Sequence, residues 1–190
     1  MRKVYTGGGD RGKTSLFSGE RISKSAAQLR AFGNLDELNS IIGALIATLP
    51  TAEPGLSEEL FAIQSDLFHL GSWLATSPDS PVAENLTEIT SDKNTKLEHA
   101  IDWISEQLPN LSGFIMPGGH ISSAWAHLAR TVCRRSERDV VEFYEQSFKG
   151  QVAQPYQNLL VYLNRLSDYF FVLARYCNLV TGVPEKLWKK

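Results

Sequence analysis

Apolar residues recur at spacings of three and four along most of the chain, and this period constrains the fold more than any other feature. Such spacing places side chains on one face of an α-helix. Turn-rich stretches interrupt the pattern at 50–55, 77–81, 109–119 and 149–155, while the alternation typical of strands is nearly absent. The sequence therefore predicts an all-α protein, a five-helix bundle preceded by a glycine-rich N-terminal segment.

These interruptions define five predicted helices. The first covers 35–49, the second begins with Ser57 as its N-cap, and the third contains the apolar residues of 97–108. The fourth begins after Gly119, and Leu128 and Val132 belong to its apolar stripe. The fifth runs from about 156 to 180, so the last two helices are the longest.

Composition and charge exclude several classes of protein. The 190 residues, 43% of them hydrophobic, suffice for one domain over 1–190, with an N-terminal phosphate-binding segment at 1–30 and a helix bundle at 33–181. A net charge of -2 argues against nucleic acid as a partner. No run approaches the roughly 18 apolar residues of a membrane span. Cys133 and Cys177 lack C-x-x-C spacing, so we expect reduced thiols in a soluble, cytoplasmic protein.

The glycine-rich segment indicates phosphate binding. Residues Gly7 to Thr14 satisfy the Walker A pattern G-x-x-x-x-G-K-[ST], in which backbone N–H groups, Lys13 and the Thr14 hydroxyl surround an anion. A true P-loop joins a buried strand to a long helix, but only six residues precede these glycines, and Gly19 interrupts the stretch after Thr14. We therefore interpret the segment as a phosphate-binding loop outside the P-loop fold. The alternative is a flexible glycine-rich terminus.

The fourth helix has a polar stripe that suits an anion. Its members share one helix face by their spacing of three and four: His127, Arg130, Arg134, Glu137 and Arg138. Arg135 lies off this stripe as a solvated charge. The alternative is a solvated face with salt bridges. No spacing typical of a metal site occurs, so a metal held by protein ligands alone is not expected.

Two further features require partners. Asn164, Asp168, Phe171 and Arg175 form a row along the apolar fifth helix, and buried polar groups are costly unless they are satisfied. Their partners are a facing helix, another subunit or a ligand, or else the row is an internal hydrogen-bond network. The stretch 113–119 contains Phe114, Ile115 and Met116, so this loop either plugs a core or lines an apolar pocket.

Six motifs in order give the chain a specific resemblance over nearly its whole length. The sequence resembles the PduO-type corrinoid adenosyltransferases in 5–12, Gly19-Glu20-Arg21, Asp36-Glu37-Leu38-Asn39, 114–119, 129–135 and 164–169. The resemblance implies a homotrimer of five-helix bundles with ATP and cobalamin bound between neighbouring subunits. It also implies that the adenosyl group of ATP moves to cobalt and that triphosphate is released. Before this transfer, a cob(II)alamin reductase supplies the electron that forms Co(I).

The resemblance also implies roles for individual residues. The ATP contacts are Thr6, Gly7, Gly8, Gly9, Thr14, Lys24, Arg134, Arg135, Glu137, Arg138 and Asn164. Arg135 thereby moves from the solvated surface to the site. Asp36 and Arg130 match a pair that meets across the subunit interface, and Phe114 matches the aromatic that closes the lower face of the corrin. Asp168 and Phe171 match the corrin-side helix, and Mg2+ arrives with ATP.

The assigned chemistry agrees with these residue types. Co(I) is the nucleophile, while Arg134, Lys24 and Mg2+ stabilise the charge on the departing triphosphate. Phe114 removes the lower ligand of cobalt and so eases the reduction of Co(II). Two departures from the family pattern are Gly7 and Gly8, where Lys or Arg and then Thr are usual, together with a rare lysine at 13. Two alternatives stay open: a P-loop-like ATPase or kinase that uses Lys13, and a non-catalytic helical interaction module.

Overall fold

The structure is a computed structural model that describes residues 4–50, 54–77, 79–148 and 154–189. Five α-helices account for most of these ranges, which confirms the predicted fold class. They are α1 (Ala27–Ile46), α2 (Pro54–Leu74), α3 (Ser91–Gln107), α4 (Ile121–Phe148) and α5 (Gln154–Val180), with a short 3-10 helix η1 (Pro81–Asn85) before α3. Helix α1 begins inside the range 1–30 that the sequence analysis gives to the N-terminal segment.

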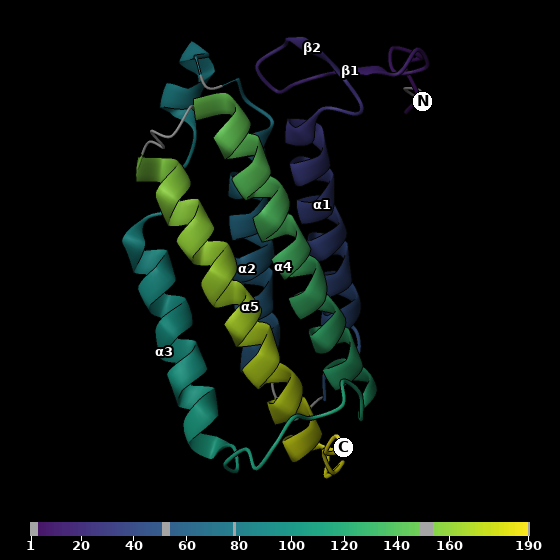
Figure 1. Ribbon diagram of the computed structural model, residues 1–190, viewed down its shortest axis with the longest axis vertical. Coiled ribbons are helices and arrows are strands. Elements are labelled where there is room, and N and C mark those ends of the chain that lie inside the picture. Colours follow the sequence, from purple (N-terminus) through teal and green to yellow (C-terminus); the bar gives the residue numbers. More distant parts are fainter. Residues whose placement is uncertain (1–3, 51–53, 78, 149–153, 190) are drawn as a thin grey trace.

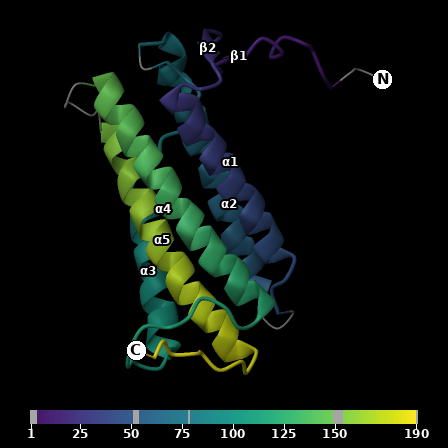
Figure 2. The ribbon, with the colours of Figure 1, turned by 45° about the vertical axis from the view of Figure 1, so that its right-hand side comes forward.

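Helix α4 occupies the centre of the arrangement because it packs along both α1 and α5. Helix α3 packs on the far side of α5, and α2 packs against α1 and lies behind α4 and α5 in the view of Figure 1. The turned view shows the same order, with α4 and α5 side by side along their whole length (Figure 2). No helix in the described ranges is long and apolar enough to cross a membrane.

The predicted apolar stripes of α1 and α2 form the core. Leu38, Ile42 and Leu45 of α1 and Leu60 and Leu70 of α2 are fully enclosed. On α4 the assignment of Leu128 to the buried stripe is wrong, because its side chain is 43% exposed. Small residues take the buried positions there instead: Ala126, Ala129, Cys133 and Ser136. They allow α4 to approach its neighbours closely, which turns Leu128 outward.

Two local features differ from the prediction. Ser57 is not an N-cap, because α2 already begins at Pro54, and proline with its fixed φ suits the first helical turn. The sequence also did not predict the antiparallel hairpin of β1 (Lys13–Ser15) and β2 (Arg21–Ser23). Strands of three residues are too short for a visible alternation. The hairpin is attached to the end of α2 by the Phe17 N–H, which donates to the Ala75 carbonyl at 2.7 Å.

The loop between α3 and α4 is fixed to α5 where it ends. Asn178 of α5 donates to the Gly118 carbonyl at 3.0 Å and accepts from the His120 N–H at 2.8 Å. Gly119 lies between them with φ of +109°, and a Cβ at this position would lie 2.2 Å from the Asn178 side-chain oxygen. Both the backbone and the space therefore require glycine here.

We expect Gly119→Ala to lower the free energy of unfolding by about 1 to 3 kcal/mol, because alanine disfavours this φ and displaces Asn178. Gly113→Ala in the same loop is the matched control, since no atom lies within 4 Å of its added Cβ. Urea unfolding at one protein concentration measures both. Equal stability of the two variants would contradict this role of Gly119.

Candidate functional site

The glycine-rich segment is a loop held open by backbone turns and one arginine. Gly7 and Gly12 have φ of +71° and +74°, a conformation that favours glycine. Arg21 of β2 donates to the Gly8 carbonyl at 2.6 Å and to the Lys13 carbonyl at 3.4 Å. The guanidinium group therefore fixes the two sides of the loop relative to each other. It also adds positive charge beside the loop backbone.

Lys24 lies directly across this loop. A Cβ built on Gly9 would lie 3.0 Å from the Lys24 Nζ atom, so a side chain at this position would displace the ammonium group from its present place. Thr6 contributes a side-chain oxygen that accepts from the Gly8 N–H at 3.4 Å. Thr14 lies in β1, and a strand, not a helix, follows the glycines. The P-loop alternative is therefore wrong, because a P-loop requires a helix N-terminus at this point.

A second polar group lies where α4 and α5 face solvent. Glu137 of α4 accepts from the Asn164 side-chain amide of α5 at 3.1 Å. Arg138 donates to the Arg134 carbonyl at 2.9 Å, and this contact lies on the exposed side of α4. Asn164 also accepts from Arg165, which forms an ion pair with Glu98 of α3 at 2.7 Å. This cluster thus combines fixed hydrogen-bond partners with arginine side chains that are open to an anion.

Arg135 points to a different neighbour. Its guanidinium group forms an ion pair with Glu37 of α1, and both side chains are nearly half exposed. The geometry agrees with the position that helix spacing alone gives Arg135, off the stripe. A role at ATP stays a prediction for this residue.

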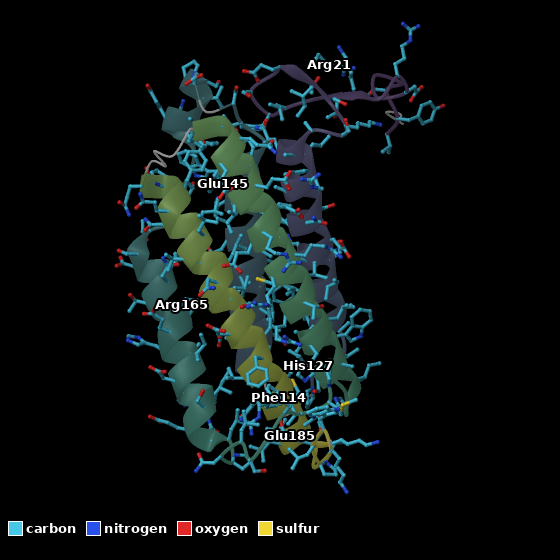
Figure 3. The ribbon with its side chains drawn as sticks, viewed as in Figure 1. Arg21, Phe114, His127, Glu145, Arg165 and Glu185 are labelled. Carbon is cyan, nitrogen blue, oxygen red and sulfur yellow. The ribbon has the colours of Figure 1, made fainter. Side chains whose placement is uncertain are left out.

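An apolar pocket of about 560 Å³ lies at the other end of α4. Its lining includes Phe114 and Pro117 of the loop, His127 and Arg130 of α4, and Phe171 of α5. The Phe114 ring is 79% exposed, so this aromatic does not plug the core and the pocket alternative holds. Figure 3 shows Phe114, His127 and Glu185 together at this end of the bundle, while Arg21 lies at the opposite end.

His127 is the most unusual polar group in this pocket. It is 4% exposed, and neither ring nitrogen has a hydrogen-bond partner within the described part of the chain. Burial and then the positive charge of Arg130 lower the pKa of His127 to about 4, although Glu185 opposes the shift. The imidazole is therefore neutral at neutral pH. Its edge-to-face contact with Phe171, at 6.4 Å between ring centres, orients the ring.

Arg130 also has a buried polar atom without a hydrogen-bond partner among the described residues. This atom is Nε, and burial followed by the charge of Arg134 lowers the pKa of the Arg130 guanidinium group. Asp36 lies elsewhere, in an apolar hollow of about 370 Å³ between the hairpin, α1 and α2. One chain therefore does not bring Asp36 and Arg130 together.

Most of the predicted site residues thus fall into three groups on one chain, and Arg135, Asp36 and Asp168 lie outside them. These groups are the glycine loop with Lys24, the cluster around Glu137 and Asn164, and the pocket around Phe114. In Figure 3, Arg21 of the first group, Arg165 beside the second and Phe114 of the third lie at successive levels of the bundle. Asp168 is exposed on α5 and belongs to none of these groups. No three His, Cys, Asp or Glu side chains in the described ranges gather closely enough to hold a metal ion.

Sequence reasoning missed the residues that hold the Phe114 loop. The sequence pattern places Arg175 only in a polar row, but its side chain is buried and forms an ion pair with Glu185 at 2.9 Å. Trp188 packs edge to face on Phe114 at 6.4 Å between ring centres. The available signal was Arg175 itself, since a lone charge in an apolar helix requires a buried partner.

Comparisons with known proteins agree with this geometry. A family model described as cobalamin adenosyltransferase matches residues 4–177. The chain is 42% identical over 190 residues to the corrinoid adenosyltransferase MMAB of Bos taurus, with 99% of this chain and 76% of the relative covered. It is 39% identical over 187 residues to the corrinoid adenosyltransferase of Bacillus subtilis, with 96% and 90% covered.

A solved structure has the same fold. It is a variant PduO-type ATP:corrinoid adenosyltransferase from Lactobacillus reuteri complexed with cobalamin and ATP. The TM-score is 0.90 at 34% identity, over 99% of this chain and all of that one. The fold and these comparisons therefore define an adenosyl-transferring enzyme. The chain belongs to the cobalamin adenosyltransferase family, which excludes the non-catalytic interaction module.

The buried imidazole makes stability depend on pH. An ordinary histidine has a pKa of 6.5 and His127 in the folded chain has a pKa of about 4. Between these two pH values the histidine is protonated in the unfolded chain and neutral in the folded chain. Stability should fall as pH drops through this window. Between pH 6.5 and 4, the free energy of unfolding of the wild type should fall by about 2 to 3 kcal/mol more than that of His127→Gln.

Urea unfolding across this pH range gives the free energy of unfolding of both proteins. Subtraction of one pH curve from the other removes the contribution of the carboxylates that both proteins share. His99→Gln replaces an exposed imidazole of α3 and serves as control. Parallel curves for wild type and His127→Gln would contradict the burial of this ring.

Proposed function

We propose that the protein transfers the 5′-deoxyadenosyl group of ATP to the cobalt of a reduced corrinoid and releases triphosphate. One observation carries this proposal: a single edge of α4 borders both an apolar pocket and a cluster of exposed arginine side chains. Arg130 lines the pocket that contains Phe114, and Arg138 lies beside the cluster of Glu137 and Asn164. Eight residues of helix span about 12 Å, which suits an extended nucleotide between the two.

The reaction needs no nucleophile from the protein. The Co(I) centre of the substrate donates an electron pair to the 5′ carbon of ATP. The carbon–oxygen bond breaks, and its electron pair leaves with triphosphate. Negative charge thus concentrates on the leaving group, where Arg134, Arg138 and Lys24 stabilise it. Arg134, with a planar donor group, suits phosphate oxygens particularly well.

The pocket supplies the other half of the chemistry. Phe114 presents an aromatic ring to the lower face of the corrin, where it removes the axial ligand of cobalt and eases reduction of Co(II) by a reductase partner. Phe171 extends the apolar lining from α5. Asp168 on the same helix contributes a polar contact at the corrin edge. Exclusion of water from this pocket keeps Co(I) from side reactions.

Magnesium fits as a companion of ATP. Mg2+ prefers oxygen ligands and keeps several waters, so a triphosphate with one protein carboxylate is enough to hold it. Glu137 is the carboxylate in the arginine cluster that would serve. The ion would neutralise part of the triphosphate charge when bound.

The division of the site supports a homotrimer with sites between subunits. The glycine loop lies at the opposite end of the bundle from the Phe114 pocket (Figure 3), and Arg130 has a buried donor without a partner among the described residues of its own chain. A neighbouring subunit would bring its glycine loop and Asp36 to these groups. Two buried, reduced cysteines accord with work in the cytoplasm.

The direct test mixes protein, ATP, Mg2+ and chemically reduced cobalamin and follows the absorbance of adenosylcobalamin. We expect one triphosphate per adenosylcobalamin formed. Inorganic phosphate as the first product, or no change in the corrinoid spectrum, would reject the proposed activity.

Subunit complementation tests the shared site. Lys24→Glu damages the glycine loop, and Arg134→Lys damages the α4 cluster, so each variant alone should be nearly inactive. In trimers formed from an equal mixture, about a quarter of the sites combine an intact loop from one subunit with an intact α4 from another. The mixture should therefore regain about a quarter of wild-type activity.

The same variants assembled separately and combined without subunit exchange provide the control. Recovery only in the exchanged sample supports sites between subunits. An inactive exchanged mixture that contains mixed trimers would show that each site belongs to one chain.

A further inference from the structure

An ion pair buried at the end of α5 joins three segments of the chain. The Arg175 side chain is 7% exposed, and its Nε and Nη2 atoms donate to the two Glu185 carboxylate oxygens at 2.9 and 3.2 Å. Nη2 also donates to the Pro109 carbonyl at 2.7 Å. Arg175 therefore connects α5, the beginning of the loop after α3 and the C-terminal segment 183–189.

The C-terminal segment forms a short antiparallel pairing with the Phe114 loop. The Met116 N–H donates to the Lys186 carbonyl, and the Trp188 N–H donates to the Phe114 carbonyl, each at 2.7 Å. Ile115 and Leu187 lie opposite each other in this pairing. These bonds hold the backbone on both sides of Phe114.

The pairing matters because the Phe114 ring has little other support. The ring is 79% exposed, and its edge-to-face contact with Trp188 is the ring contact that the described structure gives it. A ring placed on such a loop would otherwise sample many orientations. The C-terminal segment therefore restricts the orientation of the aromatic ring that, on the proposed function, contacts the lower face of the corrinoid.

We propose that the Arg175–Glu185 pair and the C-terminal segment position Phe114 for its contact with the lower face of the corrinoid. Arg175, Glu185 and Trp188 are positioning residues here, and the pair acts at a distance from the reacting cobalt. This inference rests on the proposed function of the Phe114 pocket. It adds the C-terminal segment to the parts of the chain that determine how easily Co(II) is reduced.

The test compares Glu185→Gln and Trp188→Ala with wild type in the full-length protein. Glu185→Gln leaves the buried Arg175 charge without its counter-ion, and Trp188→Ala removes the support of the Phe114 ring with no change in the bundle core. The matched controls are Glu142→Gln, which breaks an exposed ion pair with Arg30, and Trp103→Ala, which removes a tryptophan of similar exposure.

Four readouts separate positioning from general damage. Starting from Co(II) cobalamin with a reductant, both variants should lose about tenfold or more in rate, because small displacements of a positioning group have large effects. Starting from preformed Co(I), the loss should stay within about threefold. Cobinamide, which lacks the nucleotide tail that occupies the lower position, should be affected less than cobalamin. Electron paramagnetic resonance should show a smaller four-coordinate Co(II) fraction in both variants than in the controls.

The failures are distinguishable. If wild-type protein forms no adenosylcobalamin, the proposed function itself fails and this inference fails with it. If wild type is active and both variants keep its rate with Co(II) cobalamin, the positioning role is wrong. Equal losses on both corrinoids and both cobalt states, with a lowered melting temperature, would also overturn it and assign the ion pair to stability alone.

Discussion

The close packing of α4 against α5 is the constraint on which the rest of the molecule depends. Small side chains at Ala126, Ala129 and Cys133 are fully enclosed on α4, and the Cys133 thiol donates to the Leu163 carbonyl of α5 at 3.2 Å. Burial raises the pKa of this thiol, so it stays protonated and remains a donor. Because these small side chains form a narrow buried stripe on α4, the positions beside the stripe are open to solvent and lie next to α5. Arg134 and Glu137 occupy those positions, so the packing that stabilises the bundle also places the polar edge.

This edge explains how a chain of net charge -2 can recognise a polyanion. Recognition depends on local charge and not on the net charge of the chain. Arginines gather on α4, and acidic residues elsewhere on the surface offset their charge in the total. The repulsion between Arg130 and Arg134 contributes, after burial, to the lowered pKa of Arg130. On the proposed assembly, ATP and the carboxylate of a neighbouring subunit would relieve that repulsion. On the same proposal, a single chain contains charges whose partners are a ligand and a neighbouring subunit, which would account for the buried polar atoms that lack a partner among the described residues.

The sequence predicted the helices well because burial imposes the period of three and four, and α1 and α2 follow it closely. The prediction failed at Leu128, because periodicity alone does not tell which of two adjacent helix faces is buried. On α4 the buried face is the one with the smaller side chains. The hairpin was missed because pairing between strands of three residues depends on Arg21 and on an attachment to Ala75, both distant from the glycines. Likewise, the buried Arg175 indicated a need for a partner, but only folding brings Glu185 to it. Site residues came from motif resemblance, and their arrangement came from tertiary structure.

The Phe114 loop shows why an exposed aromatic can still act as a rigid part of a site. An aromatic in the core would be ordered by packing, but it would be out of reach of a large substrate. A loop gives access, yet it loses the order that burial provides. Here the loop is fixed at three points: Arg175 at Pro109, the C-terminal segment at Phe114 and Met116, and Asn178 at Gly118. Two of these anchors, Arg175 and Asn178, lie at one end of α5, the most enclosed helix of the bundle. Their hydrogen bonds therefore fix the loop of the highly exposed Phe114 to a rigid part of the fold.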